Sequence, residues 1–460
     1  MYKVFFITFG CKVNQYETDS MRSEFVSQGF VETDSADDAD IIIINSCTVT
    51  GSGDSKSLYS VRKMRKIAPN AIIALTGCLP QAAPEIAAKI PEADIVAGTK
   101  DRRKLPELVR SVIAERRHIV AIDQYGAHDE FELTRFEGAQ DKTRAFVKIQ
   151  DGCNQFCSYC IIPFVRGRVR SRKQEDVLAE VRGLAEKGFQ EVVITGIHLS
   201  SYGMDFIGET DGDYLKNGKD LRGTAFERAY LVSLLEEIAK VDGIRRIRLG
   251  SLEPRIITEE FAGRLAAIPQ LCPHFHLSLQ SGCNETLKRM NRHYTAEEYY
   301  EKVQILRKYF EHPAITTDVI VGFPGETAEE FAVTKTFLEK VHFFEMHIFK
   351  YSRRKGTVAD KLPGQLTDAQ KTERSGQLLA LEKEQSREFR AHYLGQEVEV
   401  LIEEQKEIGG KVYWLGHTDT YVKAAFAADS AECMDYSNRL VHGRAVSFLS
   451  DEVLEIALNF

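Results

Sequence analysis

The sequence has no long hydrophobic run, few cysteines for its length and no excess of positive charge. No stretch approaches the run of about 18 apolar residues that a membrane helix needs, and the N-terminal MYKVFFITFGCK lacks the charged segment and cleavage site of a signal peptide. We therefore expect a cytoplasmic protein. The formal net charge of −8 does not indicate a nucleic-acid binder, so such a role would need local basic patches.

The nine cysteines are an odd number and a small fraction of the 460 residues, which argues against the disulfide framework of a secreted protein. Several of them are clustered, and clustered thiols in a reducing compartment indicate metal or redox chemistry. Apolar residues make up 43% and charged residues 28% of the chain, a composition typical of folded proteins rather than disordered ones. The length predicts about two to four domains.

A strand, a turn and a helix alternate four times in the N-terminal region. The expected strands are residues 4–8, 41–45, 71–76 and 94–96. This alternation belongs to the α/β class and predicts an open parallel sheet with flanking helices.

Cys11, Cys47 and Cys78 each follow one of these strands, in the loop that leads to the next helix. Because the carboxyl ends of parallel strands meet at one edge of a sheet, where ligands bind, we expect the three thiols to lie together. The alternative is that each is a small buried hydrophobic residue, which is the usual place of a free cysteine.

Strands and helices alternate again from residue 141 to residue 363. The expected strands are residues 145–149, 191–195, 245–249, 275–279, 315–321 and 344–349, and the expected helices include residues 175–187, 231–239 and 297–310. Such an array predicts a full or partial β/α barrel with its active site at the carboxyl ends of the strands. The polar run 208–223 carries turn signals and is expected to be an exposed insertion.

The run DGCNQFCSYCIIP puts Cys153, Cys157 and Cys160 directly after the first of these strands. Structural zinc sites usually have four ligands, so three close thiols would need a fourth ligand from elsewhere. An iron–sulfur cluster held by three thiolates instead keeps one iron open, which suits a catalytic cluster. Tyr159 offers an aromatic surface beside it. The spacing of the three cysteines alone does not distinguish a zinc site from an iron–sulfur cluster.

These residues resemble the radical S-adenosylmethionine motif, and with the three N-terminal cysteines and a β-rich tail they resemble the radical S-adenosylmethionine methylthiotransferase family. The resemblance extends over essentially the whole chain and is most specific at both cysteine sets, at HLSLQSG and at VGFPGET. Within the family, FGCKVNQYETDS and NSCTVT are similar to the MtaB type, which modifies N6-threonylcarbamoyladenosine next to the tRNA anticodon. Other members act on isopentenyladenosine in tRNA or on a ribosomal protein, and both substrates remain alternatives.

The resemblance implies an enzyme that uses two 4Fe–4S clusters and S-adenosylmethionine to add a methylthio group to carbon 2 of the adenine. A radical cluster would lie on the radical triad, Cys153, Cys157 and Cys160. An auxiliary cluster would lie on the auxiliary triad, Cys11, Cys47 and Cys78. The implied partners are a tRNA that carries threonylcarbamoyladenosine and a flavodoxin- or ferredoxin-type reductant.

Two other classes of protein are compatible with the cysteines. A two-cluster electron carrier would need the same thiols, but it would not need a barrel with a cofactor-sized mouth. A radical enzyme whose second cluster only relays electrons would make deoxyadenosine without a methylthio product.

Positions for the cofactor follow from the same resemblance. The implied residues are Tyr159, Thr195, Gly196, Ser251, Glu253, Gln280 and Val321. Thr195 and Gly196 stand where the family binds the methionine amino group, and Ser251 and Glu253 stand where it holds the ribose. The alternatives are structural, since glycine also serves tight turns and Gln280 can be a strand-end hydrogen bonder.

Two basic runs lie next to expected strand ends. VRGRVRSRK follows the radical triad and YSRRKGT follows the sixth barrel strand, so both would lie at the barrel rim and suit phosphate contacts. The candidate RNA-binding residues in these runs are Arg166, Arg168, Arg170, Arg172, Arg353 and Arg354. The alternative is a solvated charged face.

The tail is expected to hold a helix over residues 367–393 and strands over 397–403, 411–415 and 445–449. This pattern predicts a small β-barrel, which resembles the TRAM RNA-binding domain. Trp414 and Tyr421 could stack on unpaired bases, although the tail is acidic and its aromatic residues can equally form its core. The expected domains are residues 1–120, a linker 121–140, the barrel 141–363, a helical connector 364–393 and the β-barrel 394–460.

Some chemically capable residues receive no role. His198 and His276 lie at strand positions that face the expected mouth, and we expect both to be core histidines. Cys272, Cys283 and Cys433 are isolated, and isolated cysteines are usually buried and inert.

Overall fold

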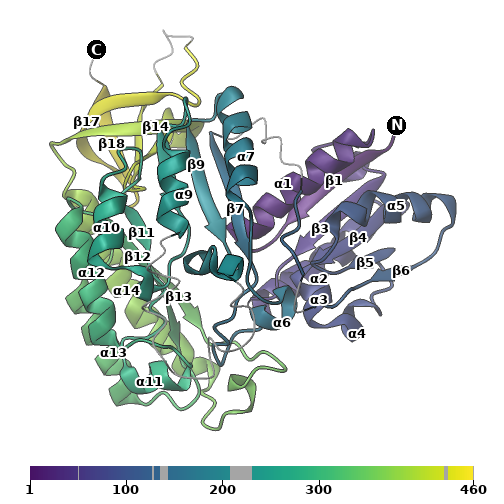
Figure 1. The fold of residues 1–460 in the computed structure, drawn as a ribbon, viewed down its shortest axis with the longest axis horizontal. Helices are drawn as coiled ribbons and strands as arrows, with labels where there is room; N and C mark the ends of the chain where they lie inside the picture. The colour runs from purple at the N-terminus through teal and green to yellow at the C-terminus, as the bar shows by residue number, and fades with distance from the viewer. Residues whose placement is uncertain (50, 127–128, 135–142, 208–229, 429–433, 459–460) are drawn as a thin grey trace.

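The computed structural model describes residues 1–49, 51–126, 129–134, 143–207, 230–428 and 434–458. The polar run 208–223 and Cys433 lie outside these residues. An N-terminal α/β sheet, a central barrel-like array and a C-terminal β-barrel follow one another along the chain (Figure 1). Among the described residues, none of the helices is both long and apolar enough to cross a membrane.

The N-terminal domain is a parallel sheet of six strands in the order β2-β1-β3-β4-β5-β6. Its strands are β1 (Lys3–Thr8), β2 (Val31–Glu32), β3 (Ile41–Ser46), β4 (Ile72–Gly77), β5 (Ile95–Ala97) and β6 (Ile119–Ala121). The four expected strands are confirmed. The edge strands β2 and β6 were not expected, because two or three residues are too few to show a periodicity and only pairing with β1 and β5 defines them.

Helices cover both faces of this sheet (Figure 1). On one face, α1 (Lys12–Ser27) and α5 (Leu105–Ala114) pack with Ile41 and Ile43 of β3. On the other, α2 (Gly51–Ile67) packs with the intervening isoleucines of β3. Alternate residues of β3 therefore point into two separate cores, which explains its continuous apolar run.

The central domain is an open, partial barrel. Its parallel strands are β7 (Arg144–Asp151), β9 (Glu191–Gly196), β10 (Arg246–Leu249), β11 (His274–His276), β12 (Ala314–Val321) and β13 (Glu345–Lys350). Regular pairing gives the orders β10-β9-β7-β8 and β11-β12-β13, where β8 (Arg170–Ser171) is a short antiparallel edge strand. Single bridges from Ile247 to Leu271 and from Leu252 to Leu277 join the two sets. The six expected strands are confirmed in number and order.

One of these strands is shorter than predicted. β11 ends at His276 instead of continuing to residue 279, although the Leu277 N–H still donates to the Thr316 carbonyl over 2.9 Å. Gln280 has a left-handed φ of 71°, which a regular strand does not accommodate, so regular pairing stops before this residue.

Helices cover the outer side of the partial barrel (Figure 1). They are α7 (Gln174–Glu186), α9 (Tyr230–Ile238), α10 (Glu259–Ala266), α12 (Ala296–Tyr309) and α13 (Ala328–Val341). Thr295 and Thr327 begin α12 and α13 with capping boxes, which satisfy the first free N–H groups of each helix. The three helices expected here are confirmed to within one residue at each end.

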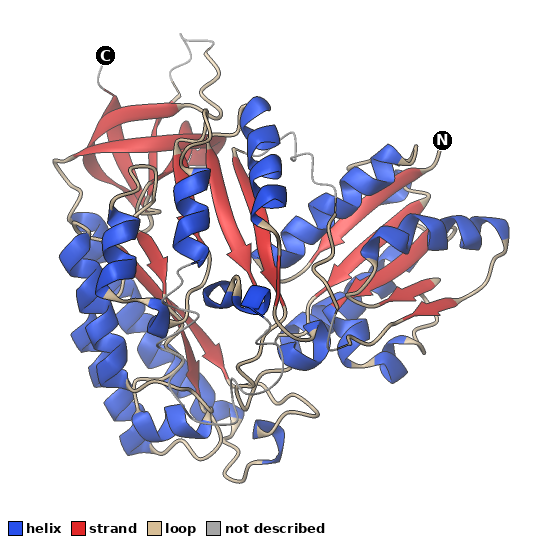
Figure 2. Ribbon diagram, in the orientation of Figure 1, coloured by secondary structure: helices blue, strands red, loops and turns tan. Residues whose placement is uncertain are grey.

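The C-terminal barrel is closed, in the order β14-β15-β16-β18-β17. Its strands lie near the C-terminus in Figure 2. Helix α14 (Asp368–Ala391) leads to β14 (Glu397–Ile408), β15 (Lys411–Thr418), β16 (Lys423–Ala427), β17 (Leu440–Ser450) and β18 (Val453–Leu458). The small β-barrel is as expected, but β16 and β18 were not predicted. β16 has the sequence KAAFA, which shows no alternation of apolar and polar residues.

The C-terminal barrel packs against the amino ends of the central strands. Arg246 at the start of β10 donates to the His417 carbonyl over 2.9 Å, and Arg248 donates to the Asp419 carbonyl over 2.8 Å. The carboxyl end of β7, which leads to Cys153, lies at the opposite end of the strand, beside the N-terminal domain. The central domain is thus covered at its amino end by the C-terminal barrel, and its strand β7 contacts α1 of the N-terminal domain.

Candidate functional site

The radical triad, Cys153, Cys157 and Cys160, lies in the loop after β7. The Cys153 N–H donates to the Gly167 carbonyl over 3.1 Å and the Cys160 N–H donates to the Cys157 carbonyl over 3.0 Å, so the loop is held in place. Burial raises the pKa of Cys153, and the charges of the other two thiols raise it further. Burial also raises the pKa of Cys160 to about 12. Three thiols this close ionise together only when a metal compensates their charge.

Arg292 is a cation beside this loop that the sequence analysis missed. Its Nη1 lies 3.2 Å from the Cys157 Sγ, and its guanidinium lies 4.8 Å from the centre of the Tyr294 ring. A cation in this position would offset the negative charge of thiolates that hold a cluster. No local spacing links Arg292 to a cysteine 135 positions earlier, so only the folded chain reveals the pair.

The auxiliary triad, Cys11, Cys47 and Cys78, lies at the carboxyl edge of the N-terminal sheet. Cys11 is the N-cap of α1, Cys47 follows β3, and Cys78 begins α3 (Cys78–Ala82). Burial raises the pKa of Cys78 to about 11, and the charges of Cys47 and Cys11 contribute to the rise. The three thiols are thus close enough to act on one another. A Cβ on Gly10, which has a φ of +104°, would lie only 2.9 Å from the Cys47 Sγ.

Arg166 joins the segment after the radical triad to the auxiliary triad. It ends α6 (Ile162–Arg166), directly behind the radical triad, and its Nη2 lies 3.7 Å from the Cys78 Sγ of the auxiliary triad. Its Nη1 lies 2.7 Å from Glu17 Oε1 and 3.2 Å from Asp151 Oδ1. The side chain is 1% exposed, so these contacts form without competition from water.

Glu17 of α1 is the centre of this buried network. Its carboxylate pairs with Arg166, with Lys148 over 2.7 Å and with Arg102 over 3.0 Å. Lys148 also pairs with Asp151 over 2.6 Å. Burial alone would raise the pKa of Glu17, but the surrounding cations hold it at about 2. The N-terminal domain is therefore fixed against the radical loop by a paired, hydrogen-bonded set of charges.

Three arginines predicted to bind RNA phosphate belong to this interior instead. Arg166, Arg170 and Arg172 are 1%, 5% and 6% exposed. Arg170 lies 3.6 Å from Asp151, and Arg172 lies 2.6 Å from Glu180. The prediction is wrong for these residues, because protein carboxylates already neutralise them and water cannot reach them.

The two arginines of the second basic run, YSRRKGT, differ in solvent exposure. Arg354 is buried and pairs with Asp54 of α2, so the prediction of a phosphate contact is wrong there too. Arg353 is 60% exposed and pairs with Asp360 over 2.9 Å. Arg168 is half-buried, with its guanidinium 5.0 Å from the centre of the Phe156 ring. RNA contact by Arg168 and Arg353 stays a prediction.

The aromatic residues of the tail are structural. Trp414 is 8% exposed in the core of the C-terminal barrel, with Tyr436 5.8 Å away. Tyr421 lies where that barrel meets the central domain, with the Arg248 guanidinium 4.6 Å and the His417 ring 4.7 Å from its ring centre. Their protein partners give both rings a structural role, and stacking on unpaired bases stays a prediction.

The residues predicted to bind the cofactor lie at strand ends of the central domain. Thr195 and Gly196 end β9, and Val321 ends β12. Tyr159 packs edge-on against Phe323 at 6.3 Å. Ser251 is exposed, Glu253 and Val321 are buried, and Gln280 has the left-handed φ described above. Their binding role stays a prediction.

Two buried polar atoms near these strand ends have no hydrogen-bond partner among the described residues: Glu253 Oε2 and His198 Nε2. The other carboxylate oxygen of Glu253 accepts from Arg255 over 2.7 Å, and His198 Nδ1 lies 2.6 Å from Ser201 Oγ. Burial lowers the pKa of His198 to about 3, so its ring is neutral. A ligand that carries hydroxyl and amino groups, as S-adenosylmethionine does, fits these unpaired atoms.

Two family profiles match the chain. One is described as the Radical SAM superfamily and matches residues 147–338, and the other is described as the uncharacterized protein family UPF0004 and matches residues 3–98. The first range begins in β7 and contains the radical triad, and the second contains the auxiliary triad.

Curated proteins resemble the chain along most of its length. The threonylcarbamoyladenosine tRNA methylthiotransferase MtaB of Bacillus subtilis is 38% identical over 93% of this chain and 90% of its own. The tRNA-2-methylthio-N(6)-dimethylallyladenosine synthase of Pelotomaculum thermopropionicum is 37% identical over 90% of this chain and 89% of its own. Among solved structures, the radical S-adenosylmethionine methyltransferase TsrM of Kitasatospora setae has a TM-score of 0.55 at 15% identity and covers 78% of this chain and 74% of its own, a likeness of fold alone. With both profiles and both cysteine triads in the expected elements, this chain belongs to the radical S-adenosylmethionine methylthiotransferase family.

Proposed function

We propose that this protein is a tRNA methylthiotransferase that converts N6-threonylcarbamoyladenosine next to the anticodon into its 2-methylthio derivative. The observation that carries the proposal is the position of Arg166, which ends the helix after the radical triad and contacts Cys78 of the auxiliary triad. An enzyme that joins a sulfur group to an unactivated carbon needs its two centres in one enclosed place. The tRNA substrate is inferred from the activities of the similar curated proteins.

The radical triad would hold one 4Fe–4S cluster and the auxiliary triad a second. When bound, these clusters and S-adenosylmethionine supply the radical and sulfur chemistry that acid and base side chains cannot perform. Glu253, with its unpaired buried oxygen, would accept a hydrogen bond from the ribose of S-adenosylmethionine. Thr195 and Gly196 at the end of β9 would bind its methionine end.

The residues around the two triads contribute charge and shielding. Arg292 beside Cys157 and Arg166 beside Cys78 offset the negative charge of thiolate ligands. Cys153 and Cys78 are 9% and 3% exposed, so water is largely excluded from their sulfur atoms. The pairing of Glu17 with Arg166 keeps the two domains in one relative position.

Lys12 favours the threonylcarbamoyl substrate. The threonylcarbamoyl group ends in a carboxylate, whereas the isopentenyl group is wholly apolar. Lys12 directly follows Cys11, and its side chain reaches into the partial barrel, where its charge acts on His274 of β11 and His347 of β13. Its Nζ lies 5.9 Å from the centre of the Tyr421 ring. Lys12 is next to Cys11 in the chain, and a cation suits an anionic side group of the target nucleoside.

The isopentenyl substrate is the second candidate, because a curated dimethylallyladenosine synthase is almost as similar to the chain as MtaB. The test is to load the protein with iron and sulfide without oxygen and to supply reductant, S-adenosylmethionine and tRNA that carries one or the other modified adenosine. Mass spectrometry of the digested nucleosides then measures methylthio addition. Addition confined to the threonylcarbamoyl tRNA supports the proposal. Addition confined to the isopentenyl tRNA, or deoxyadenosine without any methylthio product, contradicts it.

A further inference from the structure

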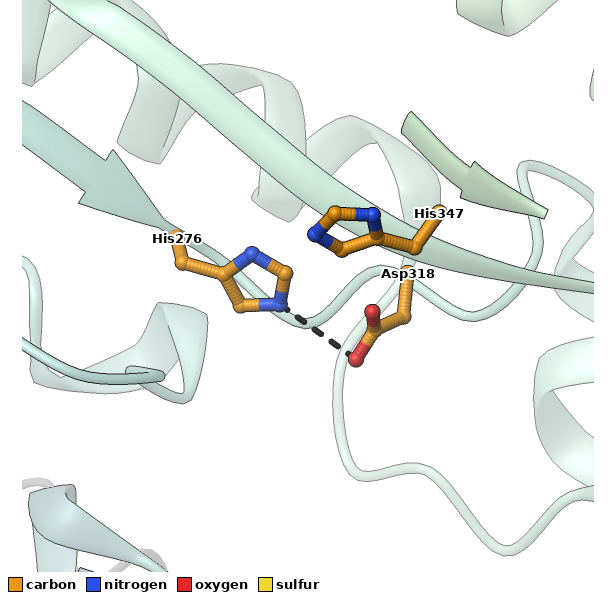
Figure 3. Close-up of side chains that lie close together, drawn as sticks. All are labelled: His276, Asp318 and His347. Carbon is orange, nitrogen blue, oxygen red and sulfur yellow. Dashed lines mark ion pairs between the residues drawn. The ribbon is translucent and has the colours of Figure 1, made fainter. Parts of the chain in front are cut away.

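Two histidines and a carboxylate from three adjacent strands of the partial barrel lie side by side, and none of them belongs to either cysteine triad. They are His276 of β11, Asp318 of β12 and His347 of β13 (Figure 3). One ligand atom from each lies within 4.8 Å of the others. Asp318 and His347 are direct partners in the pairing of β12 with β13, so the backbone itself sets their proximity. We name these residues the His–Asp–His cluster.

The cluster faces away from the helices. Residues alternate between the two faces of a strand, and Ile315, Val319 and Val321 of β12 pack in the core under the helices. Asp318 therefore points to the opposite side of β12, toward the interior of the partial barrel. His276 points to the same side, because its ring contacts Thr316, which is two residues before Asp318.

The distance between the ligand atoms of His276 and Asp318 suits the binding of one metal ion by both residues. His276 Nε2 lies 3.3 Å from Asp318 Oδ2. Metal bonds of about 2.1 Å at tetrahedral or octahedral angles separate neighbouring ligand atoms by about 3.0–3.4 Å. Both atoms can therefore bind one ion without movement of the backbone.

The hydrogen-bond partner of the second ring nitrogen of His276 also supports metal binding by this residue. Its Nδ1 lies 3.0 Å from the Thr316 hydroxyl oxygen. When Nδ1 carries the proton and donates it to this oxygen, the lone pair of Nε2 is left facing the site. Histidines that bind metals are usually oriented by such a hydrogen bond on the other nitrogen.

His347 supplies the third ligand. Its ring is stacked near that of His276, with centres 5.7 Å apart and planes at 26°, and its side chain is exposed and therefore able to turn. A neutral imidazole is the form of histidine that binds metals.

We infer that the His–Asp–His cluster binds a divalent transition-metal ion of the zinc class. A simple ion pair between His276 and Asp318 would not need a second histidine directly opposite the carboxylate. Two imidazoles and one carboxylate on three rigid strands form a three-ligand set that leaves coordination positions open for water. This site uses none of the six cysteine ligands.

Zinc binding by the cluster-loaded protein tests the inference, because iron then occupies the six cysteines. The protein is dialysed against zinc and passed over a chelating resin, the bound zinc is measured by mass spectrometry, and its ligands are identified by X-ray absorption. We expect one zinc per chain with nitrogen and oxygen ligands only. Asp318→Asn and His347→Ala should each weaken zinc binding by at least about tenfold.

Two further variants distinguish the loss of a zinc ligand from a general loss of folded structure. His342→Ala removes an exposed histidine that pairs with Glu388 over 2.9 Å, away from the cluster, and should leave zinc binding unchanged. Thr316→Val keeps all three ligands but removes the contact with His276 Nδ1, so it should weaken zinc binding less than loss of a ligand. Absence of zinc, sulfur in its ligand shell, or equal zinc binding in all variants would overturn the inference.

Discussion

The guanidinium of Arg166 lies 3.7 Å from the Sγ of Cys78 in the auxiliary triad, although Arg166 ends the short helix that follows the radical triad. The two residues are 88 positions apart in the sequence and come from different domains. Their contact, shielded from water, joins the auxiliary thiols to the radical loop. It follows that the spacing of the two triads depends on the charges around Arg166.

Replacement of Arg166 should therefore destabilise the protein strongly. Arg166→Leu would leave Glu17 and Asp151 buried with one cation fewer, and loss of one member of a buried network costs about 3–5 kcal/mol. Arg353→Leu removes an exposed ion pair with Asp360 and should cost less than about 1 kcal/mol. Denaturant unfolding of the cluster-loaded proteins measures both. Similar losses for the two variants would show that the network does not hold the domains together.

Iron content should separate the two proposed clusters. Loaded wild-type protein should contain about eight iron atoms per chain, and a variant with alanine at all three positions of either triad should contain about four. Cys272→Ala, which removes a buried thiol outside both triads, should keep all of them. Iron and sulfide analysis measures the number of iron atoms per chain. If loss of the auxiliary triad leaves the iron content unchanged, that triad does not hold a cluster.

Gly10 should be required for the auxiliary cluster. Gly10→Ala introduces a Cβ that would lie only 2.8 Å from the Cys47 Cβ and 2.9 Å from the Cys47 Sγ. It also places a non-glycine residue at a φ of +104°, where its backbone is strained. Gly29 is a matched control, since it has a φ of +87° but no atom of the described residues within 4 Å of an added Cβ. Gly29→Ala should cost about 1 kcal/mol and keep the iron, whereas Gly10→Ala should lose about half of it. Equal iron in both variants would contradict this.

Lys12 should determine preference for the threonylcarbamoyl group. Lys12→Met should lower kcat/KM for the threonylcarbamoyl tRNA by about tenfold or more, because a charge-assisted contact to the carboxylate is lost. Lys12→Arg keeps the charge and should retain part of the activity. Formation of deoxyadenosine without tRNA serves as the control for an intact radical triad. A parallel loss of activity on both tRNA types would instead indicate a structural role.

Salt dependence should identify the arginines that touch tRNA. Arg168→Ala and Arg353→Ala should each reduce the slope of log affinity against log salt concentration by about one, because each would remove one phosphate contact. Lys240→Ala removes an exposed cation outside both basic runs and should leave the slope unchanged. Binding assays at several salt concentrations measure the slopes. Equal slopes for all the proteins would place the phosphate contacts elsewhere.

The sequence alone was sufficient to predict the α/β class, most of the strands and the two cysteine triads. Its signals are local: β3 is an apolar run because both of its faces are buried, and each cysteine of the auxiliary triad follows a strand end. Strand order along a parallel sheet then brings those cysteines to one edge. Edge strands such as β2 escaped prediction, since their existence depends on a partner strand rather than on their own residues.

Only the tertiary structure decided what the charged and aromatic residues do. The arginines after Cys160 are as basic in sequence as a phosphate-binding run, yet Arg166 and Arg172 are buried against Glu17 and Glu180. Several of the side-chain pairs that decide such roles join residues more than a hundred positions apart, as Arg292 and Cys157 do. A local pattern reports the chemistry that a residue can perform. Long-range packing determines its solvent exposure and partners, and these decide whether that chemistry is used for stability, for metal binding or for contact with a substrate.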